Sequence, residues 1–150
     1  MHAKQVMNTN LVTVTPDQDL IAVSRLMREK HVGFLVVVSQ EHHGHPIGVI
    51  TDRDVVIEVI AMGIDPKSIK VADVMTSRLL IAVENEDISS ITTRMRTMGI
   101  RRVPVVSIWG KLVGIISFDD LLIFFNNILE DITASITTQR ANEKQLHSGH

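Results

Sequence analysis

Two hydroxyl–aspartate pairs with the same spacing are the residues of this chain best suited to bind a ligand. Thr51 and Asp54 form the first pair, and Ser117 and Asp120 form the second. Each hydroxyl ends an apolar run and each carboxylate comes one helical turn later, so the two side chains of a pair face the same side. The carboxylate can accept hydrogen bonds from two neighbouring ribose hydroxyls, and the hydroxyl, beside the N–H groups of a helix start, suits a phosphate. The alternative is structural: an N-cap followed by a first-turn acid.

Much of the first half of the chain is repeated in the second half. The matching segments occur in the same order: Val6-Met7 and Val74-Met75, Met27-Arg28 and Met95-Arg96, Val37-Val38-Ser39 and Val105-Val106-Ser107, and Gly48-Val49-Ile50-Thr51 and Gly114-Ile115-Ile116-Ser117. Such internal similarity indicates two copies of one structural unit. The two hydroxyl–aspartate pairs are therefore equivalent positions of the two copies.

Each copy predicts the element order β-α-β-β-α. A short extended stretch ends at Val14 or Val83, and an amphipathic helix follows, with apolar residues three and four positions apart. Two buried strands per copy are indicated by apolar and β-branched runs at 34–38, 47–50, 103–106 and 112–116. Thr51 and Ser117 can then cap a second helix. The chain is thus expected to be an α/β protein (α+β in some classification schemes) of two repeats.

The repeated unit resembles the cystathionine-β-synthase (CBS) domain, and the resemblance covers nearly the whole chain. It is carried by Asp73-Val74-Met75-Thr76, by Val103-Pro104-Val105-Val106, and by the strand ends Gly48-Val49-Ile50-Thr51-Asp52-Arg53-Asp54 and Gly114-Ile115-Ile116-Ser117-Phe118-Asp119-Asp120. The resemblance implies a tandem pair, or Bateman module, packed with pseudo-two-fold symmetry around two clefts. Its expected parts are CBS domain 1 at 4–62, a linker at 63–72, CBS domain 2 with an extended C-terminal helix at 73–136, and a polar tail at 137–150.

In CBS domain pairs the clefts commonly bind AMP, ADP, ATP or S-adenosylmethionine, and occupancy changes the geometry of an attached enzyme or transporter. The resemblance therefore implies a non-catalytic regulatory module without an obligatory cofactor, whose ligand is an adenine nucleotide or S-adenosylmethionine. No segment outside the two copies can house a catalytic domain, so we expect signalling to an unidentified protein effector in trans. Two alternatives stay open: a dimeric adaptor or scaffold without a ligand, and an RNA-binding CBS protein.

The resemblance also assigns cations to the clefts. Arg101 and Arg102 precede a strand of the second copy, where the family often contacts phosphate, and a guanidinium group holds phosphate by two parallel hydrogen bonds. The first copy has no cation at the equivalent positions, and Arg53 would have to substitute. We therefore expect the cleft of Asp120 to hold a phosphate more strongly than the cleft of Asp54. The alternative for the two adjacent arginines is a solvated basic pair.

Apolar residues of the first two strands of each copy would, by the same resemblance, line the slot for adenine. These residues are Val14, Leu35, Val83 and Val103. Their periodicity alone indicates only that they belong to the core.

The composition favours a soluble protein of the cytoplasm. Apolar residues make up 45% and charged residues 21% of the chain, as in ordinary globular domains. There is no Cys, the N-terminus lacks a signal-peptide pattern, and the apolar runs are far shorter than the ~20 residues of a membrane span. We expect neither a membrane partner nor a metal site, and we interpret His42, His43 and His45 as part of a solvated loop.

Two further functional classes are not expected. The formal net charge is −2 and aromatic residues are only 3%, which disfavours both attraction to a nucleic-acid backbone and a base-stacking platform. No nucleophile–base pair and no Walker-type loop stands out, so we do not expect an enzyme.

The last helix is expected to be apolar on more than one side. One predicted stripe consists of Leu121, Phe125, Ile128 and Ile132. Three further apolar residues lie off this stripe: Leu122, Phe124 and Leu129. A helix of this kind must be covered on more than one side, which predicts a homodimer.

Overall fold

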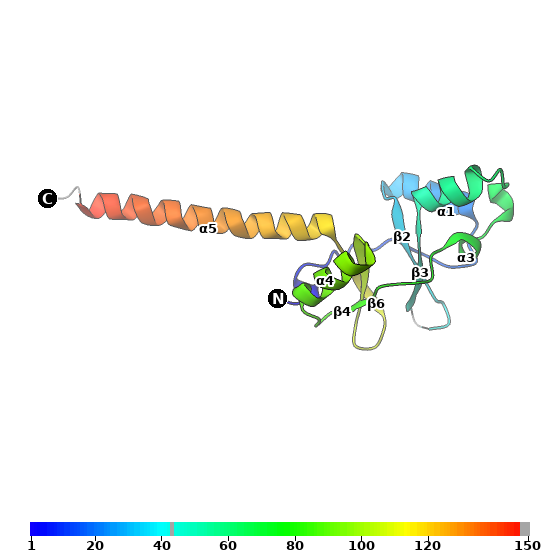
Figure 1. Cartoon of the computed structure of the whole chain (residues 1–150), viewed down its shortest axis with the longest axis horizontal. Coiled ribbons are helices and arrows are strands. Elements are labelled where there is room, and N and C mark those ends of the chain that lie inside the picture. The colour runs from blue at the N-terminus through cyan, green and yellow to red at the C-terminus, as the bar shows by residue number, and fades with distance from the viewer. Residues whose placement is uncertain (43, 148–150) are drawn as a thin grey trace.

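The computed structural model describes residues 1–42 and 44–147. It consists of two similar α/β units beside each other, from which one long helix extends (Figure 1). The first unit contains β1 (Thr13–Val14), α1 (Leu20–Lys30), β2 (Phe34–Val38), β3 (Pro46–Thr51), α2 (Asp52–Asp54) and the π-helical segment η2 (Val55–Ile60). The second contains β4 (Ala82–Val83), α4 (Ile88–Met98), β5 (Arg102–Val106), β6 (Leu112–Ser117) and α5 (Phe118–His147). Short helical segments precede each unit: η1 (Ala3–Gln5) before the first, and η3 (Pro66–Ser68) and α3 (Val71–Val74) before the second.

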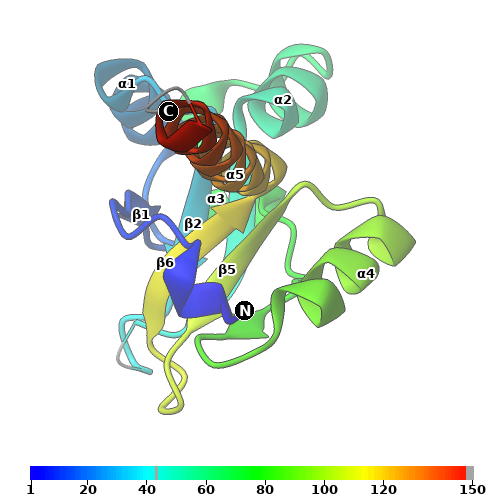
Figure 2. The same ribbon diagram turned by 90° about the vertical axis from the view of Figure 1, so that its left-hand side faces the viewer.

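Both units contain a three-stranded sheet with the same topology. The strand order is β1-β2-β3 in one sheet and β4-β5-β6 in the other, and in each the first two strands are parallel and the last two antiparallel. Figure 2, in which α5 points toward the viewer, shows the strands at the centre, with α1 and α2 above them and α4 to the right. The predicted α/β class and the order β-α-β-β-α are confirmed.

Local sequence explains where α1 and α4 begin and end. The carboxylates of Asp19 and Asp87 accept hydrogen bonds from backbone N–H groups of the first turn, at 2.8 and 2.9 Å, so an aspartate caps each helix. Both helices end in left-handed backbone, at His31 (φ 54°) and Gly99 (φ 65°). The two copies therefore use the same start and stop signals.

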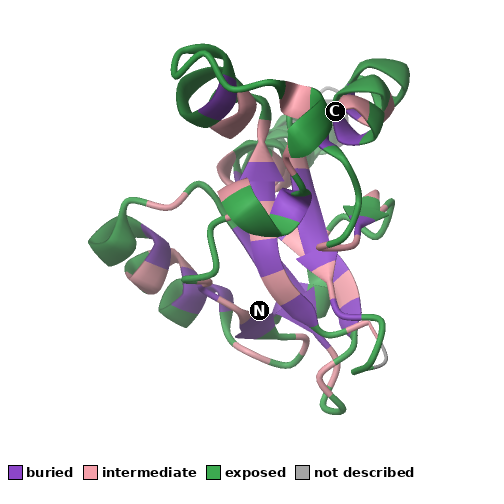
Figure 3. Ribbon diagram, turned by 90° about the vertical axis from the view of Figure 1, so that its right-hand side faces the viewer, coloured by how far each residue is buried: buried purple, intermediate pink, exposed green. Residues whose placement is uncertain are grey.

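Each unit is completed by the segment that precedes the other unit. Ala3 and Val6 are buried in the core of the second unit, and Val71 is buried in the core of the first. Main-chain hydrogen bonds extend this exchange, because Asn8 pairs with β6 and Thr76 pairs with β3. The strands carry much of the buried surface, and the outer sides of the helices are largely exposed (Figure 3). The exchanged segments therefore connect the two units by core packing and by main-chain hydrogen bonds.

Two glycines allow the exchanged segments to lie against the sheets. A Cβ atom on Gly48 would come within 2.6 Å of the Met75 sulfur, and one on Gly114 within 2.5 Å of the Met7 sulfur. Real side chains do not tolerate such contacts, so the missing side chain is what admits each methionine. This explains why the strand before each hydroxyl–aspartate pair carries a glycine.

The helix α5 leaves the body of the molecule and continues as a single rod (Figure 1). Leu121 is buried, and Phe124 and Ile128 are half-buried. Five further apolar residues form an exposed stripe, at 44–69% exposure: Leu122, Phe125, Leu129, Ile132 and Ile136. Ile123, which is 62% exposed, lies off this stripe. The stripe predicted from the sequence is thus wrong in its grouping, because the body covers the side of Leu121, Phe124 and Ile128. None of the described helices is long and apolar enough to span a membrane.

Candidate functional site

Strand alternation turns one face of each sheet toward the other unit. One face of β2-β3 carries Phe34, Val36, Val49 and Thr51, and the equivalent face of β5-β6 carries Arg102, Pro104, Ile115 and Ser117. The two faces meet where the guanidinium carbon of Arg102 lies 5.5 Å from the centre of the Phe34 ring, a cation–π distance. A hollow lies on each side of this contact.

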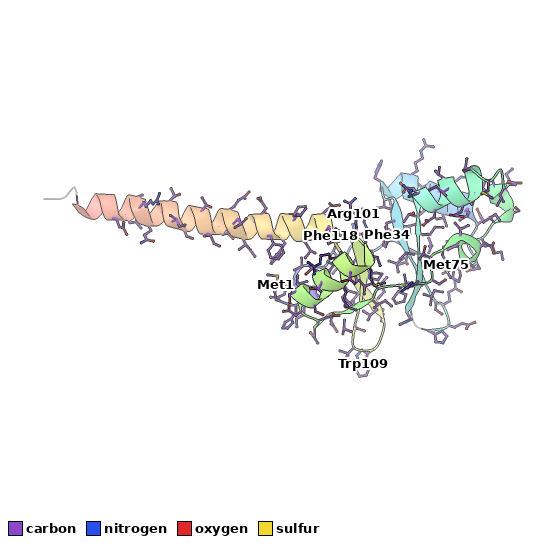
Figure 4. All side chains as sticks on the ribbon, viewed as in Figure 1. Met1, Phe34, Met75, Arg101, Trp109 and Phe118 are labelled. Carbon is purple, nitrogen blue, oxygen red and sulfur yellow. The ribbon has the colours of Figure 1, made fainter. Side chains whose placement is uncertain are left out.

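The first hollow, named here the Thr51 cleft, has a volume of about 270 Å³. Thr51 and Asp54 reach it from the end of β3 and the start of α2, while the second unit supplies three arginines: Arg78, Arg101 and Arg102. The remaining wall is mostly apolar and consists of Phe34, Val49, Thr76, Leu79, Leu80, Ile100 and Pro104. Figure 4 labels Phe34 and Arg101, which lie where the two units adjoin. The cleft therefore combines a polar end with an apolar slot.

At the polar end, Thr51 and Asp54 hold each other in place. The hydroxyl of Thr51 donates to Asp54 Oδ2 at 2.7 Å, and the backbone N–H of Thr51 donates to the same oxygen at 2.8 Å. The backbone N–H of Asp54 in turn donates to the Thr51 hydroxyl at 3.1 Å. This is a reciprocal N-cap. The second oxygen, Asp54 Oδ1, has no hydrogen-bond partner among the described residues, so it can accept from a ligand.

The charge around the Thr51 cleft is predominantly positive. Three guanidinium groups face one carboxylate, that of Asp54. Arg101 lies 3.7 Å from Asp119, but both side chains are more than half exposed, at 71% and 60%, and an exposed ion pair is worth little. Neither Arg78 nor Arg102 has an ion pair within the described part of the chain. The described lining of the cleft thus carries a net positive charge.

The second hollow, named here the Asn8 cleft, has a volume of about 260 Å³. Its lining is Asn8, Asn10, Val12, His31, Val32, Gly33, Phe34, Arg102 and Ile115. These positions are largely the repeat equivalents of the Thr51 cleft's lining, with Asn10 in place of Arg78 and Gly33 in place of Arg101. Ser117 and Asp120 form the same reciprocal N-cap as the first pair. Neither of them, however, is among the described residues that line this cleft.

The expected pairing of Arg101 and Arg102 with Asp120 is not seen, because Arg101 lines the Thr51 cleft and not the Asn8 cleft, and Arg102 lines both. Both arginines line the hollow that contains Thr51 and Asp54. The reason is the way in which the sheets face each other, because the start of β5 lies opposite the end of β3 in the other unit. The hollow with three arginines therefore combines the acid of one copy with the arginines of the other.

The predicted adenine slot is also corrected. Leu35 and Val103 have no exposed surface and Val14 is 2% exposed, each within the core of its own unit. Val83 is 40% exposed and lines neither cleft. Since successive strand residues point to opposite faces, the residues beside them, such as Phe34 and not Leu35, face the clefts.

Arg53, which the sequence offered as a substitute cation, lies away from both clefts. Its side chain is exposed and lines neither described cleft. Two polar residues of the Thr51 cleft, Thr76 and Arg78, were missed by the sequence analysis. The alternation between Val49 and Thr51 could have identified Val49, but no sequence signal places Arg78 opposite a residue of the other copy.

The histidines of the β2-β3 turn have structural contacts. The Nδ1 of His45 lies 2.9 Å from the carbonyl oxygen of Gly110, to which it donates a hydrogen bond, and so joins the turns of the two units. His42 contacts the Ser39 hydroxyl at 3.1 Å, and His43 lies outside the described residues. Within residues 1–42 and 44–147, no group of three His, Asp or Glu side chains is arranged to hold a metal ion.

Comparison with known proteins gives consistent matches. A protein of Methanopyrus kandleri is 32% identical over 118 residues, a match that covers 79% of this chain and 59% of that longer protein. The CBS domain-containing protein YhcV of Bacillus subtilis is 30% identical over 144 residues, which covers 96% of this chain and 97% of YhcV.

Solved structures share the fold. Hypoxic response protein 1 of Mycobacterium tuberculosis aligns with a TM-score of 0.71 at 30% identity, over 81% of this chain and 97% of that chain. The CBS domain pair of protein MJ0100, solved with 5-methylthioadenosine and S-adenosyl-L-methionine, aligns with a TM-score of 0.72 over 85% of this chain and 97% of that chain. Its identity is 22%, so this likeness concerns the fold alone.

The family model for the CBS domain matches the chain twice, at residues 3–61 and 71–127. These two matches contain both three-stranded sheets and both hydroxyl–aspartate pairs, and the second match ends within α5. The chain therefore belongs to the CBS domain family and contains two CBS domains.

Proposed function

We propose that this chain is a regulatory module that binds an adenine nucleotide in the Thr51 cleft. The observation that carries the proposal is the meeting of Asp54 with Arg78, Arg101 and Arg102 around one hollow. The free Oδ1 of Asp54 is the acceptor for the ribose hydroxyls, and the arginines hold the phosphate.

The shape of the cleft suits a nucleoside. Its volume of about 270 Å³ is close to the lower end of the ~300–1,000 Å³ that is usual for small-molecule sites. Phe34, Val49, Leu80 and Ile100 offer apolar surface to a flat base. The solved MJ0100 pair supports an adenosine-type ligand, because its fold accommodates two of them.

The charges favour AMP, ADP or ATP over S-adenosylmethionine. A sulfonium compound brings positive charge toward three guanidinium groups, whereas a phosphate brings the opposite charge and bidentate acceptors. Because both units contribute to the cleft, a bound nucleotide bridges them and stabilises one relative arrangement. We infer that a partner protein in trans recognises this arrangement of the two units and that the chain itself performs no catalysis.

The exposed apolar stripe of α5 supports a homodimer. Leu122 and Leu129 are 69% and 62% exposed, and on η2 Val56 and Ile60 are 56% and 58% exposed. Apolar surface of this extent on two helices is typical of an interface. A second copy of the chain would cover both.

Calorimetric titration with AMP, ADP, ATP and S-adenosylmethionine tests the proposed function. We expect saturable binding of at least one adenine nucleotide and weaker binding of S-adenosylmethionine. A nucleotide present at a hundred times its dissociation constant should also stabilise the fold by about 2.7 kcal/mol. No binding of any adenine nucleotide would leave the dimeric adaptor without a ligand as the function.

A further inference from the structure

Arg102 and Phe34 lie on the border between the two clefts. They occupy equivalent positions of the two repeats, and each of them lines both the Thr51 cleft and the Asn8 cleft. The guanidinium carbon of Arg102 is 5.5 Å from the centre of the Phe34 ring. This pair is therefore shared by the two hollows, and one of its members carries a positive charge.

The two clefts depend on this arginine to different degrees. The Thr51 cleft has two further arginines, Arg78 and Arg101. The Asn8 cleft has Asn10 and Gly33 at those positions, and Arg102 is the one arginine among its described lining residues. A phosphate group in the Asn8 cleft would therefore rely on a cation that the other cleft also uses.

We propose that the two clefts compete for Arg102, so that a phosphate-bearing ligand in the Thr51 cleft weakens the binding of a second one in the Asn8 cleft. This proposal rests on the function proposed above and concerns its regulation. One guanidinium group can turn its donors toward one phosphate, and the Phe34 ring is the surface on which it rests between the two. Linkage requires the effect to be reciprocal.

The consequence is a module that holds one phosphorylated ligand per chain over a wide range of concentration. The Asn8 cleft, with its asparagines and His31, then binds a phosphorylated ligand only when the Thr51 cleft is empty or the concentration is high. An uncharged nucleoside in the Asn8 cleft would not need Arg102 and would escape the competition.

The test follows each cleft separately during titration with ATP. His31 lines the Asn8 cleft only, so the NMR signal of its ring reports occupancy of that cleft, while calorimetry reports the first, tighter binding. In the unaltered protein we expect the His31 signal to change at ATP concentrations about ten-fold above those that saturate the first site.

The decisive variant is Arg78→Gln combined with Arg101→Gln. Both side chains are exposed and belong to the Thr51 cleft alone, so the variant weakens that cleft and leaves Arg102 in place. Competition predicts that the midpoint of the His31 change then moves to about ten-fold lower ATP concentration. Independent clefts predict no movement.

Two controls complete the experiment. Arg25→Gln with Arg96→Gln removes the same charge from exposed positions of α1 and α4, and should leave the midpoint unchanged. In an Arg102→Gln background, the Arg78→Gln and Arg101→Gln changes should no longer move it. If the decisive variant still binds ATP and the midpoint of the His31 change does not move, the proposed competition is overturned and the proposed function is not. Absence of binding of AMP, ADP and ATP alike to the unaltered protein overturns the proposed function as well.

Discussion

The two carboxylate oxygens of Asp54 have different surroundings. Oδ2 accepts hydrogen bonds from the hydroxyl and the backbone N–H of Thr51, whereas Oδ1 has no partner among the described residues. One side chain can therefore cap α2 and still present an acceptor to the Thr51 cleft. The structural and the ligand-binding interpretations of the hydroxyl–aspartate pair, which the sequence left open, are compatible.

Replacement of the two equivalent aspartates should separate capping from binding. Asp54→Ala and Asp120→Ala each remove the carboxylate half of a reciprocal N-cap and keep the hydroxyl that caps the helix, and each should lower the free energy of unfolding by about 1 kcal/mol. Only Asp54→Ala should weaken AMP binding, by about ten-fold, because it also removes hydrogen bonds to a charged group. Chemical denaturation and calorimetry measure the two effects. Equal losses of affinity in the two variants would refute the assignment of the ribose to Asp54.

At the scale of the elements, the repeat made most of the fold predictable. Alternation and β-branched runs identified the strands, and Asp19 and Asp87 stand where helix starts were expected. The face of each strand residue was harder to predict, since Leu35 and Phe34 are both apolar and only the register decides which of them meets the core. A one-residue error of this kind reassigns the whole adenine slot.

The aspartate that caps α4 has an additional ionic contact, with the N-terminal ammonium group. The Ser89 hydroxyl and backbone N–H donate to Asp87, and the N-terminal ammonium group lies 3.1 Å from its carboxylate; together these contacts lower the pKa of Asp87 from 3.8 to about 2. A carboxyl whose pKa is lowered in the folded state adds stability above its unfolded pKa, and this contribution is lost as the pH falls from 3.8 toward 2.

The melting temperature of Asp87→Ala should therefore approach that of the unaltered protein in acid. We expect Asp87→Ala to have a lower melting temperature than the unaltered protein at pH 7. The difference in melting temperature should become smaller as the pH falls to about 2. Asp19→Ala, which removes the equivalent N-cap of α1, controls for general effects of acid. A gap that stays constant between pH 7 and pH 2 would contradict this origin of the stability.

At the scale of the whole molecule, the cleft depends on how the two units face each other. Thr51 and Asp54 come from one repeat and the arginines from the other, and no local pattern states which acid will meet which cation. Within a repeat, Arg101 and Arg102 belong with Asp120, whereas in the structure they line the cleft of Asp54. The exchange of the segments around Val6 and Val71 between the two cores was equally outside the reach of local patterns.

The exposed stripe of α5 makes a prediction about assembly. Its residues are spaced by three and four positions, as in a helix that pairs with another helix. Ile132→Glu, which places a charge in the stripe, should shift the chain from dimer toward monomer in sedimentation experiments. Ala134→Glu adds the same charge on the far side of α5 and should leave the dimer intact. A monomeric unaltered protein, or equal behaviour of the two variants, would exclude pairing through this stripe.

The most direct test of the account is a crystal structure of the chain grown with AMP. We expect the nucleotide in the Thr51 cleft, with a ribose hydroxyl about 2.5–3.0 Å from Asp54 Oδ1 and the phosphate against Arg78, Arg101 or Arg102. An empty Thr51 cleft at saturating AMP, or a nucleotide held beside Asp120 instead, would contradict it.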